Sequence, residues 1–131
     1  MSNVDLNNGN ILAYIGDGVM TLTVRQFLVE QGFTKAKELQ EKSTFYISAK
    51  AQAAVVSVLL EEGFFNEKEE TVYRLGRNYK GHSIAKNADV QTYKMASGFE
   101  AVWGYWHLNN NPQRLKEIWD KTRTIVEESL C

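Results

Sequence analysis

Residues 10–31 read NILAYIGDGVMTLTVRQFLVEQ, and their apolar positions recur with the period of an α-helix. At 100° per residue, one side of this helix carries Ile11, Ile15, Val19, Leu22 and Val29. The opposite side carries Ala13, Met20, Val24, Phe27 and Leu28. Because a helix that is apolar nearly all round belongs in the interior, we expect a buried first helix that ends at Gly32.

Cap and stop signals divide the rest of the chain into further helices. Asn66 and Glu69 have the spacing of a capping box. Asn111 can cap another helix, with Pro112 as its first residue. We expect these helices after Thr34, from Ser48 to Glu62, from Asn66 to Arg77, from Asp89 to Leu108 and from Asn111 to the C-terminus. No stretch alternates with period two, so the sequence predicts an all-α fold of about six helices.

The composition is typical of one soluble domain. The chain has 131 residues, of which 44% are hydrophobic and 24% charged, and it contains no repeat or flexible linker. We therefore expect a single domain over residues 1–131. Its 15 Lys and Arg residues nearly balance 16 Asp and Glu residues, for a net charge of −1. Any binding of nucleic acid would thus need a local cluster of positive charge.

The chain has features of a cytoplasmic protein. Its one cysteine is Cys131, so no disulfide can form within the chain, which favours a reducing compartment. The first eight residues lack the charge and the apolar stretch of a signal peptide. The apolar run from Ala53 to Leu60 is too short to cross a bilayer. We expect a cytoplasmic protein that does not contact a membrane.

Two isolated acids stand in the two most apolar helices. Asp17 and Arg25 are the only charged residues between Leu6 and Val29, and Glu100 is the only acid between Val90 and Gln113. A buried carboxylate is costly unless it is paired or bound to a metal, and bases are scarce in both helices. A shared divalent cation is one explanation, and Mg²⁺ suits oxygen ligands. The alternative is that both acids are hydrogen-bonded core residues.

Basic residues gather between the fourth and fifth expected helices. Residues 74–87 contain no acid and include Arg74, Arg77, Lys80, His82 and Lys86. Such a cluster is typical of phosphate binding, because Arg makes bidentate contacts to phosphate oxygens. The alternative is a solvated loop whose charges offset nearby acids. Together with a Mg²⁺ site, the cluster favours a phosphodiester substrate.

The two acids also lie in recognisable motifs. Residues 12–19, LAYIGDGV, resemble the signature of the ribonuclease III family. Residues 97–104, SGFEAVWG, resemble the family's second acidic motif, D-x-x-E-A-x-x-G. Residues 74–78 and 85–94 are similar to the short Mini-ribonuclease III subgroup, which consists of the catalytic domain alone. The resemblance covers nearly the whole chain.

The resemblance implies a ribonuclease III-type endonuclease domain that forms a homodimer and cuts both strands of double-stranded RNA. It implies Mg²⁺ as cofactor, with Mn²⁺ as a substitute, and products with a 5′-phosphate and a 3′-hydroxyl. It further implies maturation of 23S (large-subunit) ribosomal RNA, with a large-subunit ribosomal protein as a possible partner. Asp17 and Glu100 match catalytic, metal-associated acids of the family. Two other family acids fall on Ala13 and Ser97, which leaves the number of metal ions open.

The residues that contact RNA and a second subunit can also be predicted. A separate domain for binding duplex RNA does not fit in the chain, so Arg74, Arg77, Lys80, His82 and Lys86 would contact the RNA backbone. We expect the first and fifth helices, with their glycines and surplus apolar faces, to contribute to the subunit contact. Two alternatives stay open. Ala13 and Ser97 favour a catalytically silent RNA-binding or ribosome-associated module with the same fold, and a helical protein-interaction domain would make both acids structural.

Overall fold

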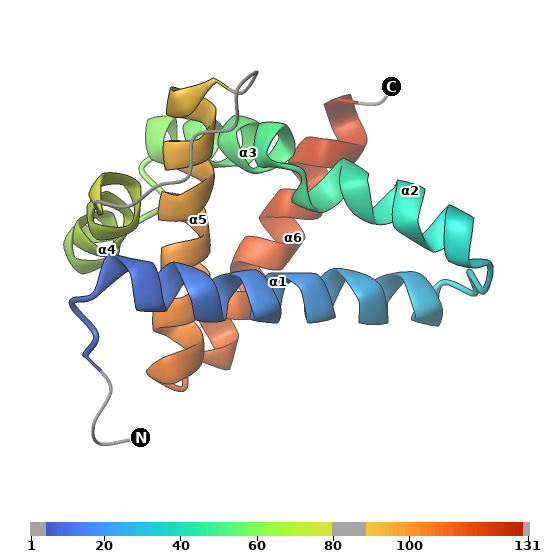
Figure 1. The fold of residues 1–131 in the computed structure, drawn as a ribbon, viewed down its shortest axis with the longest axis horizontal. Helices are drawn as coiled ribbons and strands as arrows, with labels where there is room; N and C mark the ends of the chain where they lie inside the picture. Colours follow the sequence, from blue (N-terminus) through green and yellow to red (C-terminus); the bar gives the residue numbers. More distant parts are fainter. Residues whose placement is uncertain (1–4, 80–88, 130–131) are drawn as a thin grey trace.

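The structure is a computed structural model that describes residues 5–79 and 89–129. Within these ranges it consists of helices joined by short loops, with no strand (Figure 1). The all-α prediction is confirmed, and the expected helix boundaries lie close to those observed. The helices are α1 (Gly9–Glu30), α2 (Ala36–Ile47), α3 (Ala49–Glu61), α4 (Glu67–Asn78), α5 (Val90–Leu108) and α6 (Pro112–Ser129).

The predicted caps account for most helix starts. Asn66 and Glu69 form the expected capping box, in which each side chain accepts a hydrogen bond from the other residue's backbone N–H. Ser48 caps α3 and Asp89 caps α5, each by accepting a backbone N–H of the first turn. The cap of α1 is Asn8, which the sequence analysis did not single out. These hydrogen bonds satisfy backbone donors that have no partner inside the helix.

Helix α5 is the centre of the domain. It crosses α1 steeply and packs against α1, α4 and α3 (Figure 1). Its Phe99, Trp103 and Trp106 are fully buried. Two glycines allow α1 and α5 to approach closely, because a Cβ at Gly16 would collide with the carbonyl of Glu100 and a Cβ at Gly104 with that of Leu12. This contact fixes the position of Asp17 relative to Glu100.

Most glycines of these two helices serve contacts within the chain. Gly16 and Gly104 lie at the α1–α5 crossing, and Gly98 lies against the Tyr73 ring of α4. The expectation that the glycines of α1 and α5 form the subunit contact is therefore wrong for these three positions. Gly18 differs from them, since a Cβ there would meet nothing within 4 Å.

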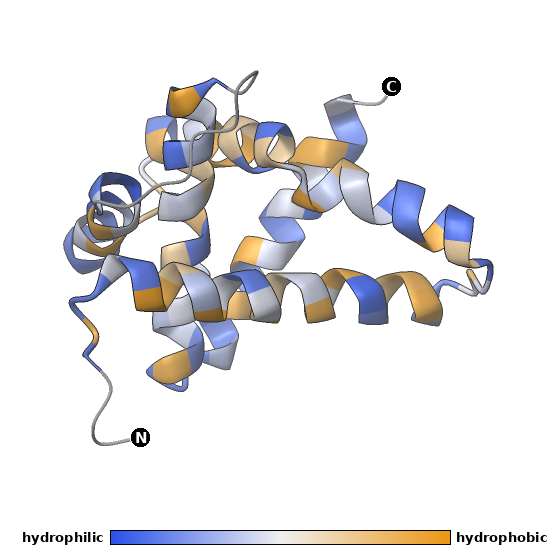
Figure 2. Ribbon diagram, in the orientation of Figure 1, coloured by the Kyte–Doolittle hydropathy of each residue, from blue (hydrophilic) through white to orange (hydrophobic). Residues whose placement is uncertain are grey.

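Helix α1 is buried on one side only. Leu12, Met20, Val24 and Leu28 belong to the core, as expected for an interior helix. The other side is open and apolar, with Ile11 40%, Tyr14 78%, Leu22 65% and Val29 60% exposed (Figure 2). The expectation of a helix buried all round is therefore wrong for this chain by itself. The periodicity detects apolar faces but does not show what covers each of them.

One stretch of the described residues has the length and mean hydropathy of a membrane-spanning helix. Ala36–Glu61 is long and apolar enough by length and mean hydropathy alone. Ser48 has an extended backbone, however, and it divides this stretch into α2 and α3. Val55, Val56 and Leu59 of α3 are fully buried in the core of the domain. We therefore interpret α3 as a core helix.

A buried ion pair links α4, α5 and α6. Glu69 is only 3% exposed, and it accepts hydrogen bonds from Trp106 Nε1 at 2.9 Å and from Arg114 Nε at 3.0 Å. Arg114 also donates to the carbonyl of Phe64. Burial alone would raise the pKa of Glu69, but the hydrogen bonds from Arg114, Asn66 and Trp106 outweigh it and lower the pKa. Glu69 is thus held as a carboxylate inside the protein.

Candidate active site

The two acids singled out in the sequence meet in the structure. Asp17 of α1 and Glu100 of α5 have their carboxyl groups within hydrogen-bonding reach of each other. The close crossing at Gly16 produces this arrangement, since Gly16 precedes Asp17 and touches the Glu100 backbone. The expected convergence of the two side chains is therefore observed. Their catalytic and metal-binding roles stay predictions.

The two carboxyl groups have different surroundings. Asp17 is exposed to solvent, whereas most of the Glu100 side chain is covered. Burial raises the pKa of Glu100 to about 8, and the hydrogen bond and negative charge of Asp17 act in the same direction. Two like charges this close disfavour ionisation of both groups. Glu100 therefore keeps its proton at neutral pH unless a positive charge enters the site.

This donor set fits a hard divalent cation. Both groups offer oxygen ligands, and a cation between them would neutralise the repulsion that now favours a proton. Among the described residues, no three or more His, Cys, Asp or Glu side chains lie close enough together to hold a metal ion. The protein would thus supply two carboxylates, with water and substrate oxygens as further ligands. Mg²⁺ is commonly bound in this way.

A third polar side chain reaches the pair and was missed by the sequence analysis. Gln52 of α3 is 3% exposed, and its Nε2 lies 3.4 Å from Glu100 Oε2. The same nitrogen donates to the carbonyl of Ile47 at 3.0 Å. The available signal was a lone amide in an apolar helix, since residues 51–60 are otherwise almost entirely Ala, Val and Leu. That signal does not by itself indicate a function.

The positions of the two absent family acids lie beside the site. Ala13 precedes Asp17 by one helical turn and is 6% exposed, and Ser97 precedes Glu100 by almost one turn. Side chains three or four residues apart share a helix face, so acids at these positions would face the same region. Their replacement leaves the pair of Asp17 and Glu100 without the two additional carboxylates of the fuller family pattern.

Part of the basic cluster is described by the structure. Arg74 is half exposed on α4, where it contacts Glu70 at 3.9 Å and donates to Thr71 Oγ1 at 3.3 Å. Arg77 donates to Asn78 Oδ1 at 3.1 Å and lies over the Tyr73 ring. Lys80, His82 and Lys86 lie outside the described residues. The predicted RNA-binding role of all five residues stays a prediction.

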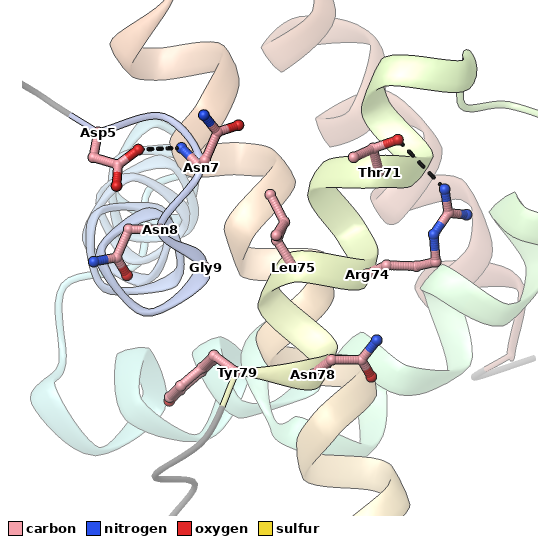
Figure 3. A pocket seen from close by; sticks show the side chains of 9 residues that line it. All are labelled: Asp5, Asn7, Asn8, Gly9, Thr71, Arg74, Leu75, Asn78 and Tyr79. Atoms are coloured by element: carbon pink, nitrogen blue, oxygen red, sulfur yellow. Dashed lines mark hydrogen bonds between the residues drawn. The ribbon is translucent and has the colours of Figure 1, made fainter.

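An open cleft of about 590 Å³ lies beside Arg74, between the start of α1 and helix α4 (Figure 3). Figure 3 shows α1 nearly end-on, with the amides of Asn7 and Asn8 on one side of the cleft and Arg74 and Asn78 on the other. The remaining lining residues are Asp5, Gly9, Thr71, Leu75 and Tyr79. The cleft thus offers hydrogen-bonding groups at the end of the helix that carries Asp17.

Comparisons with known proteins identify the family of this chain. A family profile described as the Ribonuclease III domain matches residues 10–111, a range that contains both acids. The chain belongs to the ribonuclease III family. A protein of Streptococcus pneumoniae named Mini-ribonuclease 3 is 48% identical over 90% of this chain and 92% of its own length. Another Mini-ribonuclease 3, from Staphylococcus aureus, is 39% identical over 97% of this chain and 95% of its own length.

A solved structure supports the fold independently. A crystal structure of a Fusobacterium nucleatum protein aligns with a TM-score of 0.78 and covers 86% of this chain and 90% of its own. Its sequence identity is 21%, so this likeness concerns the fold alone. Membership of the ribonuclease III family gives the activity class, which is that of an endoribonuclease.

Proposed function

We propose that this ribonuclease III-family protein is a Mg²⁺-dependent endonuclease that cuts both strands of double-stranded RNA. The observation that carries the proposal is the meeting of Asp17 and Glu100 at the α1–α5 crossing. The raised pKa of Glu100 supports it, because a cation between the carboxyl groups would replace the proton that Glu100 now holds. Mn²⁺ is expected to substitute for Mg²⁺.

The residues of the pair have separate tasks in this proposal. When bound, a divalent cation would activate a water for attack on phosphorus and stabilise the departing 3′-oxygen. The products of this hydrolysis would carry a 5′-phosphate and a 3′-hydroxyl. Exposed Asp17 lies on the solvent side, where an RNA phosphate can approach. Glu100 must release its proton before its carboxylate can act as a ligand. The burial of Glu100 keeps water away from one side of the pair. It would therefore strengthen the attraction between the Glu100 carboxylate and the cation.

The basic cluster is proposed to hold the RNA backbone. Arg74 is half exposed, and the cleft beside it adds amide groups able to contact phosphate or 2′-hydroxyl oxygens. Gly9 at the cleft and Asp17 stand on one helix, about 12 Å apart along its axis. That separation lies well within the length of a short RNA duplex. Arg77, Lys80, His82 and Lys86 would extend the contact along the backbone.

The exposed apolar face of α1 is proposed to bind a second copy of the chain. Ile11, Tyr14, Leu22 and Val29 lie along one side of the helix, which also carries the exposed Arg25. Several large apolar side chains exposed on one side of a helix are typical of an interaction site. Because α1 also carries Asp17, a homodimer through this face would place two acid pairs on one assembly, which suits cleavage of both RNA strands.

The cellular substrate is proposed to be the precursor of 23S (large-subunit) ribosomal RNA, cut in the cytoplasm. This part of the proposal is supported by the resemblance of residues 74–78 and 85–94 to the Mini-ribonuclease III subgroup and by the similarity to proteins named Mini-ribonuclease 3. We further propose that residues 1–131 form a single domain, whose RNA affinity should be modest and depend strongly on salt. A large-subunit ribosomal protein that shapes the RNA would then assist cleavage.

Ala13 and Ser97 favour one competing function, a catalytically silent RNA-binding module. To separate the two, duplex RNA is incubated with wild type and with Asp17→Asn, in Mg²⁺ and in chelator, and binding is measured in chelator. The proposed nuclease cleaves only as wild type with Mg²⁺, while both proteins bind RNA. RNA binding without cleavage by wild type in Mg²⁺ or Mn²⁺ would establish the silent module instead.

A further inference from the structure

Gln52 occupies a position that an apolar residue would fill at lower cost. It is 3% exposed and is surrounded in sequence by small and apolar residues of α3. Within the described part of the chain, its Oε1 is buried and has no hydrogen-bond partner. A buried acceptor without a partner is destabilising, because its lost contact with water is not compensated. This cost indicates that the amide does more than fill space.

The orientation of this amide is determined by its surroundings. The carbonyl oxygen of Ile47, the last residue of α2, can only accept a hydrogen bond, and it lies 3.0 Å from Gln52 Nε2. The nitrogen must therefore face Ile47, and the carbonyl oxygen of the amide cannot take its place. Nε2 has a second hydrogen, and it donates to Glu100 Oε2, which lies 3.4 Å from this nitrogen. The end of α2 is thereby linked to the carboxyl group of Glu100.

The Glu100 carboxylate needs such a link to keep one orientation. Its side chain has several rotatable bonds and lies opposite the carboxyl group of Asp17. Asp17 is exposed and lies on a different helix, and the two carboxyl groups repel when both are charged. A carboxylate that binds a cation must keep one orientation while its neighbour approaches the same ion. Gln52 is a neutral donor to Glu100. Groups behind a metal ligand commonly fix its geometry in this way.

We infer that Gln52 is a positioning residue for the proposed nuclease reaction, and that its amide holds the Glu100 carboxylate where it and Asp17 bind one divalent cation. This inference rests on the proposed function. It adds to the two-acid site a neutral side chain from a third helix. The ligand concerned is a hard divalent cation, and Gln52 acts on it only through Glu100.

Binding of Mn²⁺ to the metal-free protein, measured by calorimetry, tests this inference without any cleavage assay. Gln52→Met keeps the length of the side chain and removes the donor. We expect Mn²⁺ to bind this variant about 10- to 100-fold more weakly than wild type. In a Glu100→Gln background, the same Gln52→Met change should alter affinity by no more than about twofold, because the ligand it positions is already lost. Gln113→Met, at an exposed position of α6, is the matched control and should leave affinity unchanged.

The outcomes distinguish the inference from the function on which it rests. If wild type binds Mn²⁺ and cleaves duplex RNA while Gln52→Met binds Mn²⁺ equally well, the positioning role is wrong and the nuclease stands. An equal loss in both backgrounds also overturns it, because Gln52 then acts independently of Glu100. If wild type neither binds Mn²⁺ nor cleaves, both proposals fail together.

A second measurement covers the case in which Gln52→Met does not fold. In wild-type protein, the side-chain amide of Gln52 gives its own pair of ¹H–¹⁵N resonances. We expect this pair to shift during a Mg²⁺ titration, with a midpoint equal to that of the Mg²⁺ dependence of cleavage. The side-chain amide of Gln113 should not move. Resonances of Gln52 that stay in place throughout the titration would overturn the positioning role.

Discussion

Gly16 lies against the backbone carbonyl of Glu100 so closely that no side chain fits between them. A Cβ added at Gly16 would also approach the backbone N of Gly104, so neither helix can give way locally. The contact places the residue after Gly16, which is Asp17, beside the Glu100 carboxyl group. The active-site pair is thus a consequence of how tightly α1 and α5 pack.

Gly16→Ala should therefore separate the two helices. We expect it to reduce the free energy of unfolding by about 3 kcal/mol or more, because the added methyl group forces a backbone shift. Gly18→Ala is the matched control on the same helix, with open space beside it, and should be neutral or stabilising by up to about 1 kcal/mol. Chemical denaturation measures both. Equal effects of the two changes would show that the crossing tolerates a side chain.

The pH dependence of stability should report the buried carboxyl group of Glu100. Its pKa is about 8 in the folded protein against an ordinary value of 4.5, so the folded state binds the proton more tightly than the unfolded state. The metal-free protein should then lose stability as pH rises from about 4.5 to 8, by an amount on the order of a few kcal/mol. Glu100→Gln should abolish most of this loss. Chemical denaturation in chelator at several pH values measures this loss. If the free energy of unfolding fell equally with pH in wild type and Glu100→Gln, the loss would not come from Glu100.

The buried pair of Arg114 and Glu69 should matter more for stability than any surface pair. Arg114→Met leaves the Glu69 carboxylate buried without its cation, and we expect a loss of about 3 to 5 kcal/mol. Lys116→Met removes an exposed pair with Asp120 and should cost less than about 1 kcal/mol. Thermal unfolding of the two variants compares these effects. A similar, small loss in both would mean that Glu69 finds another partner or a proton.

The apolar face of α1 should control assembly. Leu22→Glu places a charge on this face at a position 65% exposed in the single chain, so the monomer should remain folded while the dimer dissociates. Phe45→Glu introduces the same charge at an exposed aromatic residue of α2 and serves as the control. Light scattering after size exclusion gives the mass of each species. A monomeric wild type, or a Leu22→Glu variant that still forms dimers, would exclude this face as the subunit contact.

The basic cluster should determine how RNA binding depends on salt. Replacing Arg77 and Lys80 together by Gln should weaken binding to duplexes of any sequence and lower the slope of log affinity against log salt by about 1 to 2. Lys37→Gln, on the exposed surface of α2, is the control and should leave the slope unchanged. Filter binding or fluorescence anisotropy in chelator provides both values. An unaltered slope in the double variant would show that these residues do not contact phosphate.

Local signals in the sequence predicted more of this structure than long-range pairings did. The capping box of Asn66 and Glu69 was predictable because both partners lie within one helical turn. Asp17 and Glu100 stood out because each is an isolated acid in an apolar helix, and such residues need a partner. The partner of Glu69, in contrast, is 45 residues away, and nothing in the local pattern of Arg114 indicates it.

Two features of the site required the packed structure. Gln52 lies in α3 without any motif around it, and only the packing of α3 on α5 brings its amide to Glu100. The sequence predicts a buried face where α1 is open, because periodicity identifies an apolar stripe without showing whether the same chain covers it. A helix that is apolar all round indicates two contacts, and one of these can come from another molecule.

Crystals soaked in Mn²⁺ test the central proposal most directly, through the anomalous signal of the metal. We expect a peak between the Asp17 and Glu100 carboxyl groups, with at least one of their oxygens about 2.0 to 2.2 Å from the ion. The peak should vanish in Glu100→Gln crystals soaked in the same way. A catalytically active protein whose Mn²⁺ lies elsewhere, or whose Glu100→Gln variant keeps the peak at full height, would contradict a cation held by this pair.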